Sequence, residues 1–500
     1  MNGMTWNSPQ ARWLLIATVT ASGMGFLDGS VVGVALPTIG RELNAGISGL
    51  QWIQNGYMLT LASLILVSGS LSDRLGLRRI FLLGTIGFAI ASALCAAADS
   101  VGVLITARVL QGIGAALLTP CSLALVEAEF SGADRDRAIG AWSGLTGIFN
   151  AIGPFLGGWL VDAGNWRYIF LINIPLAMLV IVIMHWRIPA LGNRRGGKRP
   201  LDLAGATLTV VGLAGITYAL TALGTAGIQA PAVFVPGLIG IVALVLFAYT
   251  IRRGAQPLIP RVLFRSRQFA AANLTTVGVY AALGITFFLL VMQLQLVLGY
   301  SALQAGVATL PITLLMLLLS ARSGALSARI GPRWQMSIGP LLMAIGLLLM
   351  RRIETGADYF TDIFPAVVIV GLGLASTVAP LTATALVAGG TDNAGIASGV
   401  NNAVSRAAQL AAVAAIPALV GIGGRNYLDP AHFSAAFGAA LYIAAALAAV
   451  SGVIAWLLVP GKLQAERNTT PRYLCGADSA PLQSCDARAA GSSPRQDDRS

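Results

Sequence analysis

The sequence contains very little charge. Only 10% of its 500 residues are Asp, Glu, Lys or Arg, whereas 56% are hydrophobic, and the mean hydropathy is +0.77. A water-soluble globule needs far more charge to cover its surface. The composition therefore excludes a soluble protein and predicts a polytopic membrane protein.

Histidine and cysteine are also scarce. The two histidines, His185 and His432, lie far apart near the ends of apolar runs, and the four cysteines show no metal-site spacing. One string, Gly192 to Lys198, resembles a phosphate loop, but Arg199 follows where magnesium binding requires Ser or Thr. We therefore predict no enzyme, no catalytic residue, no metal site and no cofactor. Without a nucleotide site, any transport would have to run on an ion gradient.

The net charge of +12 does not indicate a nucleic-acid partner. Almost all basic residues lie in short segments between apolar runs, around residues 74–79, 135–137, 187–199 and 252–267. These segments fall on one side of a membrane if the N-terminus does, and that side is cytoplasmic by the positive-inside rule. Lysine occurs only twice, which indicates a GC-rich bacterial genome. We expect a multi-pass protein of a bacterial cell membrane, surrounded by lipid bilayer, with both termini in the cytoplasm.

Fourteen apolar runs are long enough to cross a bilayer, which needs about 20 residues per helix. They lie at 13–38, 50–71, 80–98, 101–126, 138–161, 167–185, 202–223, 232–251, 268–296, 302–324, 335–350, 361–389, 396–422 and 433–459. This pattern predicts an all-α fold with six helices, two additional central helices and six more.

A charged turn occurs twice. The order of residues from Gly69 to Arg79 returns from Gly324 to Arg333, with Ala328 in place of Asp73. The repeat predicts two related halves with a substrate site between them near the middle of the membrane. The predicted division is an N-terminal half (1–185), a basic cytoplasmic linker (186–200), two additional helices (201–251), a C-terminal half (252–460) and a disordered cytoplasmic tail (461–500).

One acid, Asp28, falls well inside a predicted span. A charged side chain in hydrocarbon is costly, so Asp28 should face the bundle interior or a watery cavity. Burial disfavours the charged form of a carboxylate, as a proton carrier requires, although a structural hydrogen-bonding acid would be buried too. The acids of the second half are predicted to lie in loops: Glu354, Asp358, Asp362, Asp392 and Asp429.

Two spans carry a polar face at helical spacing. In the fourth span Arg108 and Gln111 share a face, which predicts either a partner for Asp28 or a polar contact that holds helices together. In span thirteen the corresponding face could line a substrate cavity or pack between the halves; it consists of Asn402, Arg406 and Gln409.

Two further motifs contain glycine. In the fifth span Gly153, Pro154, Gly157 and Gly158 allow close helix packing, and the proline also favours a hinge or gate. The charged turn is either a solvated loop or a cytoplasmic latch, because a helix dipole can hold a carboxylate near a helix N-terminus. The latch residues would be Gly69, Asp73, Arg74, Gly76, Arg78 and Arg79.

Together these stretches resemble the major facilitator superfamily, and more closely its fourteen-helix drug:proton antiporter branch. The family's cytoplasmic turn resembles Gly69 to Arg79, with Leu77 as a departure, and its helix-four element resembles Arg108 to Gly112. Its antiporter motif resembles Gly153 to Gly158. The helix-one motif of the branch resembles Leu27 to Pro37, with departures at Ser30 and Gly33, and the start of its helix six resembles Trp166 to Pro175.

The resemblance implies alternating access, in which proton entry is exchanged for export of a hydrophobic or cationic drug or antibiotic. It implies that Asp28 binds proton or substrate, that Arg108 supports coupling, that Gly153 to Gly158 restrict leak and that Asp73 latches the cytoplasmic side. Alternatives are export of an amino acid, siderophore or self-made antibiotic, or a membrane sensor that does not transport. An uptake symporter is disfavoured by the antiporter motif.

Overall fold

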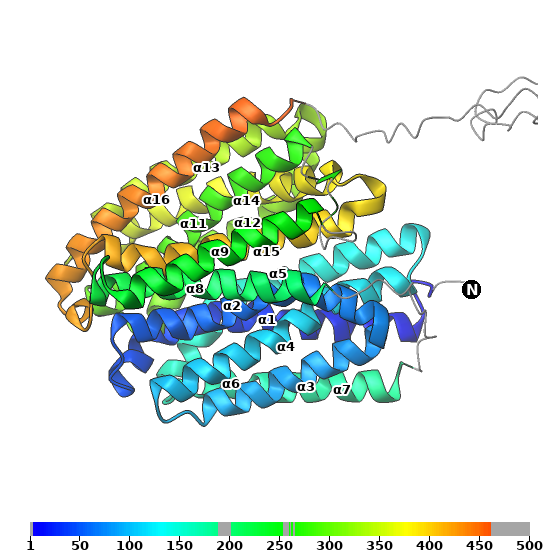
Figure 1. Cartoon of the computed structure of the whole chain (residues 1–500), viewed down its shortest axis with the longest axis horizontal. Helices are drawn as coiled ribbons and strands as arrows, with labels where there is room; N and C mark the ends of the chain where they lie inside the picture. Colours follow the sequence, from blue (N-terminus) through cyan, green and yellow to red (C-terminus); the bar gives the residue numbers. More distant parts are fainter. Residues whose placement is uncertain (1–3, 189–201, 254–259, 261, 264–265, 462–500) are drawn as a thin grey trace, which may run out of the picture. The chain divides into compact units, whose positions relative to one another are not determined.

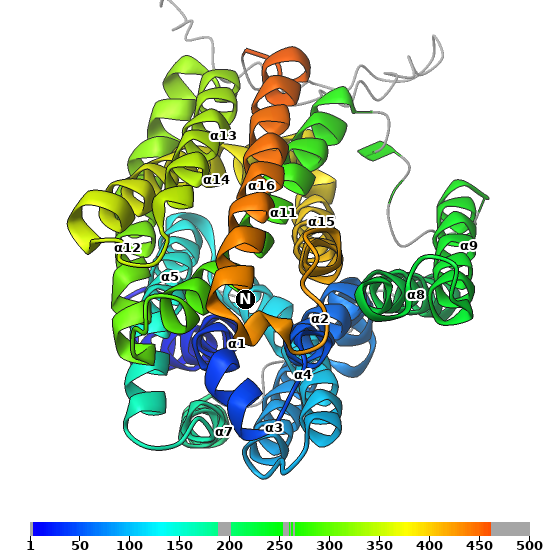
Figure 2. The ribbon, with the colours of Figure 1, turned by 90° about the vertical axis from the view of Figure 1, so that its left-hand side faces the viewer.

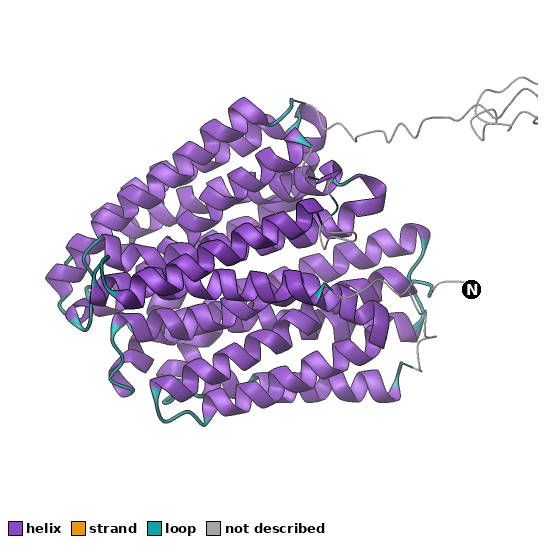
Figure 3. Cartoon of the chain, viewed as in Figure 1, coloured by secondary structure: helices purple, strands orange, loops and turns teal. Residues whose placement is uncertain are grey.

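The protein is a bundle of long helices, as the hydropathy pattern predicted (Figures 1 and 3). The computed structural model describes residues 4–188, 202–253, 260, 262–263 and 266–461. Within these residues, twelve helices are long and apolar enough to span a membrane. Most of the predicted linker at 186–200, with the string from Gly192 to Lys198, and the predicted tail after residue 461 lie outside the described residues.

The helices follow the predicted order. The N-terminal half contains α1 (Pro9–Glu42), α2 (Ile47–Leu75), α3 (Leu77–Ala96), α4 (Val101–Glu129), α5 (Gly132–Asp162), α6 (Tyr168–Leu171) and α7 (Asn173–Trp186). Two further helices are α8 (Leu203–Ala226) and α9 (Pro231–Arg253). The C-terminal half contains α11 (Arg267–Leu296), α12 (Ala302–Ile330), α13 (Pro332–Leu349), α14 (Phe364–Ala388), α15 (Gly390–Leu419) and α16 (Pro430–Leu458).

The fourteen predicted spans correspond to helices in this order, although α2 and α15 are not among the twelve that are apolar enough to span a membrane. Three details differ. The sixth span consists of α6 and α7, with Ile172 between the two helices. Asp362 lies in a π-helical turn (Tyr359–Ile363) that leads into α14, so its predicted loop position is wrong. Asp392 lies in the first turn of α15, because that helix begins six residues before the apolar run from which it was predicted.

Side-chain caps define where several helices begin. The Ser8 hydroxyl accepts a hydrogen bond from the Ala11 amide, and Pro9 occupies the first turn of α1. At the start of α12, Ser301 and Gln304 form a capping box in which each side chain accepts from the other residue's backbone. Such caps satisfy backbone N–H groups that have no partner within the helix.

The two halves repeat the same packing. In the N-terminal half α3 packs on α4, α4 on α2, and α1 on α5; in the C-terminal half α13 packs on α14, α14 on α12, and α11 on α15. The repeated turns also match: Gly76 (φ 95°) and Gly331 (φ 88°) each separate two helices, and their amides donate to Ser72 and Ser327. Positive φ favours glycine, so the two turns have the same backbone conformation as well as a similar sequence.

The two halves meet through pairs of helices, one from each half, and α8 and α9 lie to one side. Helix α5 packs on α12, and α2 packs on α15, while α11 contacts α1. Helix α8 packs on α9 and also contacts α2 and α15, which Figure 2 shows at the edge of the bundle. The apolar segment of α11 is 78% buried and that of α9 only 11%. Helix α11 therefore lies at the centre of the bundle, whereas α9 presents an apolar surface suited to lipid.

Candidate functional site

Asp28 lies in a closed polar cluster inside the N-terminal half. Its side chain forms an ion pair with Arg108 of α4, and both residues are only 1% exposed. Gln111 donates from Nε2 to Asp28 Oδ1 (2.7 Å) and accepts from Arg108 Nη1 at its Oε1 (2.6 Å). Asn173 of α7 donates to the same Oδ1 (3.3 Å). The structure thus brings Asp28, Arg108 and Gln111 together, which is one of the two interpretations that the sequence left open.

Two small side chains of α3 complete this cluster. Gln111 Nε2 donates to the Ser92 hydroxyl (2.8 Å), which also accepts from Asn173 Nδ2 (3.4 Å). The Cys95 thiol donates to Gln111 Oε1 (3.6 Å). Ser92, Cys95 and Asn173 are fully buried. Helices α1, α3, α4 and α7 therefore each contribute a side chain to one hydrogen-bonded network.

Residues of α2 also contact Arg108. Its Nε donates to the Ile53 carbonyl oxygen (3.1 Å), and its guanidinium carbon lies 4.4 Å from the centre of the Tyr57 ring. On another side it lies 5.8 Å from the Phe170 ring centre. A cation over an aromatic face is stabilised by the ring quadrupole. The positive charge of Arg108 is thus compensated by a carboxylate, two oxygen acceptors and two rings in a region without exposed surface.

The segment that begins α6 and α7 supports this cluster. Trp166 is fully buried and donates to Glu42 Oε2 at the end of α1 (2.6 Å), while Arg167 forms an ion pair with the same carboxylate. These contacts fix the end of α1 to the start of α6. Asn173 follows in the same segment and reaches Asp28. The stretch from Trp166 to Asn173 therefore contacts α1 at two places, at its end through Glu42 and further along the helix through Asp28.

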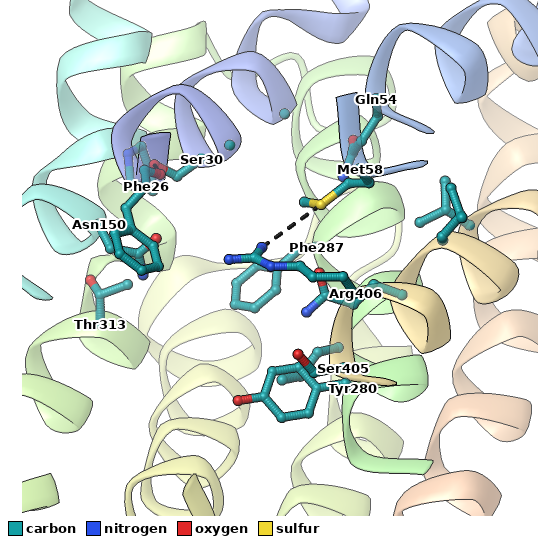
Figure 4. A pocket seen from close by; sticks show the side chains of 18 of the residues that line it. Phe26, Ser30, Gln54, Met58, Asn150, Tyr280, Phe287, Thr313, Ser405 and Arg406 are labelled. Carbon is teal, nitrogen blue, oxygen red and sulfur yellow. Dashed lines mark hydrogen bonds between the residues drawn. The ribbon is translucent and has the colours of Figure 1, made fainter. Parts of the chain in front are cut away.

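A cavity of about 360 Å³ lies between the two halves (Figure 4). Its walls come from α1, α2 and α5 on one side and from α11, α12, α14 and α15 on the other. Ligand pockets typically have volumes of about 300–1,000 Å³. The structure places the predicted polar residues of span thirteen in this wall: Asn402, Arg406 and Gln409.

The cavity and the Asp28 cluster lie on two sides of the same helices. Gly25 and Gly29 line the cavity on α1, on either side of Asp28 in sequence, while the Asp28 side chain does not line it. On α2, Gln54 and Asn55 line the cavity directly after Ile53, whose carbonyl oxygen binds Arg108. A movement of α1 or α2 would therefore alter both sites.

The glycine motif of α5 brings the halves into close contact. A Cβ atom at Gly157 would lie 2.8 Å from Val31 Cγ1 of α1, and one at Gly158 would lie 2.5 Å from Leu303 Cα of α12. The Pro154 carbonyl oxygen also lies against Gly306 of α12. Any side chain on these faces would separate the helices. The motif therefore packs one face of α5 against α1 and a neighbouring face against α12 of the other half.

Hydrogen bonds between the halves gather at one end of the bundle, which we call the closed end. It contains the connections α1–α2, α5–α6, α11–α12 and α15–α16. There the Asp162 carboxylate accepts from the amides of Ala302 and Leu303, at 3.2 and 2.9 Å, at the start of α12. A carboxylate at a helix N-terminus satisfies free N–H groups and is favoured by the helix dipole.

The start of α2, with the residues before it, makes the second set of contacts at the closed end. Gln51 donates to the carbonyl oxygens of Val413 (2.6 Å) and Ala414 (3.0 Å) in α15. The Tyr427 hydroxyl donates to the Ala45 carbonyl oxygen (2.8 Å). These interactions and those of Asp162 join the halves along both sides of the closed end.

The repeated charged turn lies at the opposite end. Gly76 ends α2, Arg78 donates to the Met184 carbonyl oxygen of α7 (2.6 Å), and Gly69, Arg74 and Arg79 are exposed. The side chain of Asp73 lies outside the described part of the structure. The latch role of this turn therefore stays a prediction.

Fold and site together define a polytopic helical membrane protein with two related halves around a central cavity. The sequence matches the profile of the Major Facilitator Superfamily over residues 18–413. The chain belongs to this superfamily.

Several similar proteins are named as resistance proteins. The chain is 35% identical to the multidrug resistance protein Stp of Mycobacterium tuberculosis over 401 residues, covering 78% of this chain and 72% of that protein. It is 32% identical to the puromycin resistance protein of Streptomyces alboniger over 481 residues, covering 92% and 94%. It is also 32% identical over 397 residues to the tetracenomycin C resistance and export protein of Streptomyces glaucescens, covering 77% and 71%.

Solved structures with the same fold are transporters. The peptide transporter POT in complex with sulfate has a TM-score of 0.64 at 17% identity, covering 90% of this chain and 96% of that chain. The inward open xylose transporter XylE from E. coli has a TM-score of 0.59 at 14% identity, covering 89% and 96%. At these identities the likeness concerns the fold.

Sequence reasoning did not identify several residues of the two sites. Ser92, Cys95 and Asn173 belong to helices whose neighbours the sequence does not reveal, although a lone asparagine in an apolar segment was a usable signal for Asn173. Asn55 was missed in the same way on α2. Asp162 was missed because it ends its span and resembles an ordinary loop acid.

Proposed function

We propose that the protein is a proton-coupled exporter of drugs or antibiotics that works by alternating access. The observation that carries this proposal is the buried Asp28–Arg108 pair directly behind a cavity between the halves. Ionisable residues inside membrane bundles mark substrate or ion pathways by default. The similarity to resistance and export proteins such as Stp and the tetracenomycin C protein supports the direction of transport.

In this proposal Asp28 carries the proton. Its carboxylate is engaged by Arg108, Gln111 and Asn173 and does not line the cavity, which favours a proton over a drug as its ligand. Protonation would remove the counter-charge of Arg108 and leave a buried guanidinium without a carboxylate. Because such a state is costly, proton binding would drive a rearrangement of α1 and α4.

The arrangement of the closed end supports a transport cycle. With the N-terminus in the cytoplasm, as the basic segments predict, the closed end containing Asp162 and Gln51 faces outward. The described conformation is then inward-facing, and export requires the contacts of Asp162 and Gln51 to break. Gly153 to Gly158 would keep α5 and α12 close enough to exclude a leak while the halves move.

The test is substrate-induced proton release from energised everted membrane vesicles, followed with a pH-sensitive dye. The panel contains puromycin, tetracenomycin C, methylenomycin A and cationic dyes. We expect release with at least one compound in the wild type and in Asp99→Asn, whose acid is exposed, but not in Asp28→Asn. Unimpaired release in Asp28→Asn would remove Asp28 from coupling. Silence across the panel, with protein confirmed in the membrane, would favour a narrow metabolite exporter or a sensor.

A further inference from the structure

The cavity contains one formal charge. Among the described residues that line it, Arg406 of α15 is the only acidic or basic side chain. The remaining wall is apolar or carries neutral polar groups, with aromatic rings at Phe26 and Phe287 (Figure 4). The described cavity is therefore positively charged and otherwise suited to an apolar body.

Arg406 has no carboxylate partner among the described residues. None of the ion pairs found there includes it, and its described hydrogen bond runs from Nη1 to Met58 Sδ at 3.7 Å. A thioether sulfur is a weak acceptor. In Figure 4 the guanidinium group reaches from α15 toward Met58. The guanidinium therefore retains donors for a ligand within the cavity.

The nearby acid does not compensate this charge. Both carboxylate oxygens of Asp28 are engaged on the far side of α1, Oδ2 by Arg108 and Oδ1 by Gln111 and Asn173. Charges in a medium of low dielectric interact strongly, so Arg406 repels a cation in the cavity and attracts an anion. The Asp28 carboxylate is already paired with Arg108, which reduces its effect on a ligand.

Unpartnered polar groups on α2 provide an independent sign of a ligand site. Asn55 is 1% exposed, and neither its Nδ2 nor its Oδ1 has a hydrogen-bond partner among the described residues. Gln54 Oε1 is likewise buried without a partner. Both residues line the cavity. Buried polar groups are nearly always hydrogen-bonded, so these side chains would find partners in a bound molecule once they turn toward the cavity.

We propose that the cavity binds an amphipathic organic anion, with its carboxylate or equivalent charged oxygen on Arg406 and an apolar ring system between Phe26 and Phe287. Asn55 lies in the cavity wall of the other half, and its side-chain amide has no other partner among the described residues. This proposal rests on the proposed export function and specifies its substrate class. It departs from the cationic compounds that the family resemblance implied.

The test uses three fluorescent probes with one apolar body and different charge: anthracene carboxylate, anthracene methanol and aminomethyl anthracene. Their dissociation constants are measured on purified protein in nanodiscs, with empty nanodiscs subtracted. The variants are Arg406→Gln, which removes the charge, and Arg406→Lys, which keeps it. The matched control is Arg351→Gln, because Arg351 lies against Tyr442 and outside the cavity. Size-exclusion chromatography establishes that each variant is folded.

We expect the carboxylate to bind the wild type about tenfold more tightly than the amine, since a hydrogen bond to a charged group is worth about one to two decades of affinity. Arg406→Gln should abolish this preference, whereas Arg406→Lys and Arg351→Gln should keep it. An amine that binds as tightly as the carboxylate would overturn the proposal. So would a carboxylate affinity that folded Arg406→Gln leaves unchanged, or no carboxylate binding at millimolar concentration.

Failure of this proposal can be distinguished from failure of the export function, because binding to purified protein needs no proton gradient. Proton release driven by cations, without charge preference in binding, would overturn the substrate class alone. Binding of the carboxylate that depends on Arg406, without proton release by any compound, would overturn the export function alone.

Discussion

Replacing Asp28 by Asn tests the buried ion pair most directly. The substitution preserves the size of the side chain and an oxygen that can accept from Gln111 and Asn173. It removes the negative charge opposite Arg108, which is 1% exposed and cannot reach solvent without movement. The variant therefore leaves a buried positive charge without a counter-charge and resembles the protonated state of the acid.

The expected cost follows from the remaining partners of Arg108. Removing one member of a buried ion pair typically costs about 3–5 kcal/mol. Arg108 keeps Gln111 Oε1 at 2.6 Å, the Ile53 carbonyl oxygen at 3.1 Å and the Tyr57 ring at 4.4 Å. We therefore expect Asp28→Asn to lower the free energy of unfolding by about 3 kcal/mol, the lower end of that range.

A double-mutant cycle separates this charge effect from other damage. The variant with both Asp28→Asn and Arg108→Gln carries neither charge and should regain about half of the lost stability, because no unpaired charge remains buried. The assay is unfolding of purified protein in mixed micelles of mild detergent and SDS. Both variants that contain Asp28→Asn should lack drug-linked proton release, whatever their stability.

An exposed ion pair provides the control. The side chains of Arg167 and Glu42 are 26% and 45% exposed, and their pair should show a coupling energy of only about 0–1 kcal/mol in the same cycle. A double variant at Asp28 and Arg108 that is no more stable than Asp28→Asn alone would refute the reasoning. Equal coupling energies for the buried and the exposed pair would refute it as well.

Three further substitutions test the closed end and the repeated turn. Gly158→Ala places a Cβ 2.5 Å from Leu303 Cα and should reduce drug export from vesicles by about tenfold, whereas Gly140→Ala, with open space at its Cβ, should not. Asp162→Asn should lower the free energy of unfolding by about 0.5–1 kcal/mol, because the start of α12 loses its negative partner; an unchanged value would contradict that role. Gly76→Ala, at φ 95°, should cost about 1–2 kcal/mol in the same unfolding assay, and a neutral effect would contradict strain there.

The sequence predicted the fold well because the bilayer restricts it. Every spanning segment must satisfy its backbone internally, so long apolar runs become helices, and only their ends vary. The break at Ile172 and the helical positions of Asp362 and Asp392 escaped prediction for this reason. They depend on how a helix begins at the edge of an apolar run, where hydropathy carries little information.

The site was predicted in part. Helical spacing placed Arg108 and Gln111 on one face, and the cost of a buried acid pointed to Asp28, so their meeting was one of two interpretations left open. Spacing within one helix does not tell which helices become neighbours. Asn173 and Asn55 therefore became visible only when α7 and α2 were packed against the rest.

The separation of the two sites constrains how coupling works. Gly25 and Gly29 line the cavity and Asp28 contacts Arg108 away from it, so in the proposed mechanism drug and proton would not compete for the same atoms. Coupling then requires that each ligand favour a different arrangement of α1 and α2, because a ligand shifts a conformational equilibrium only by its difference in affinity. On α2, the Ile53 carbonyl oxygen accepts a hydrogen bond from Arg108. Asn55, two residues further on, lines the cavity. A displacement of this short segment would change the surroundings of the Asp28 cluster and of the cavity in one step, as the proposed exchange requires.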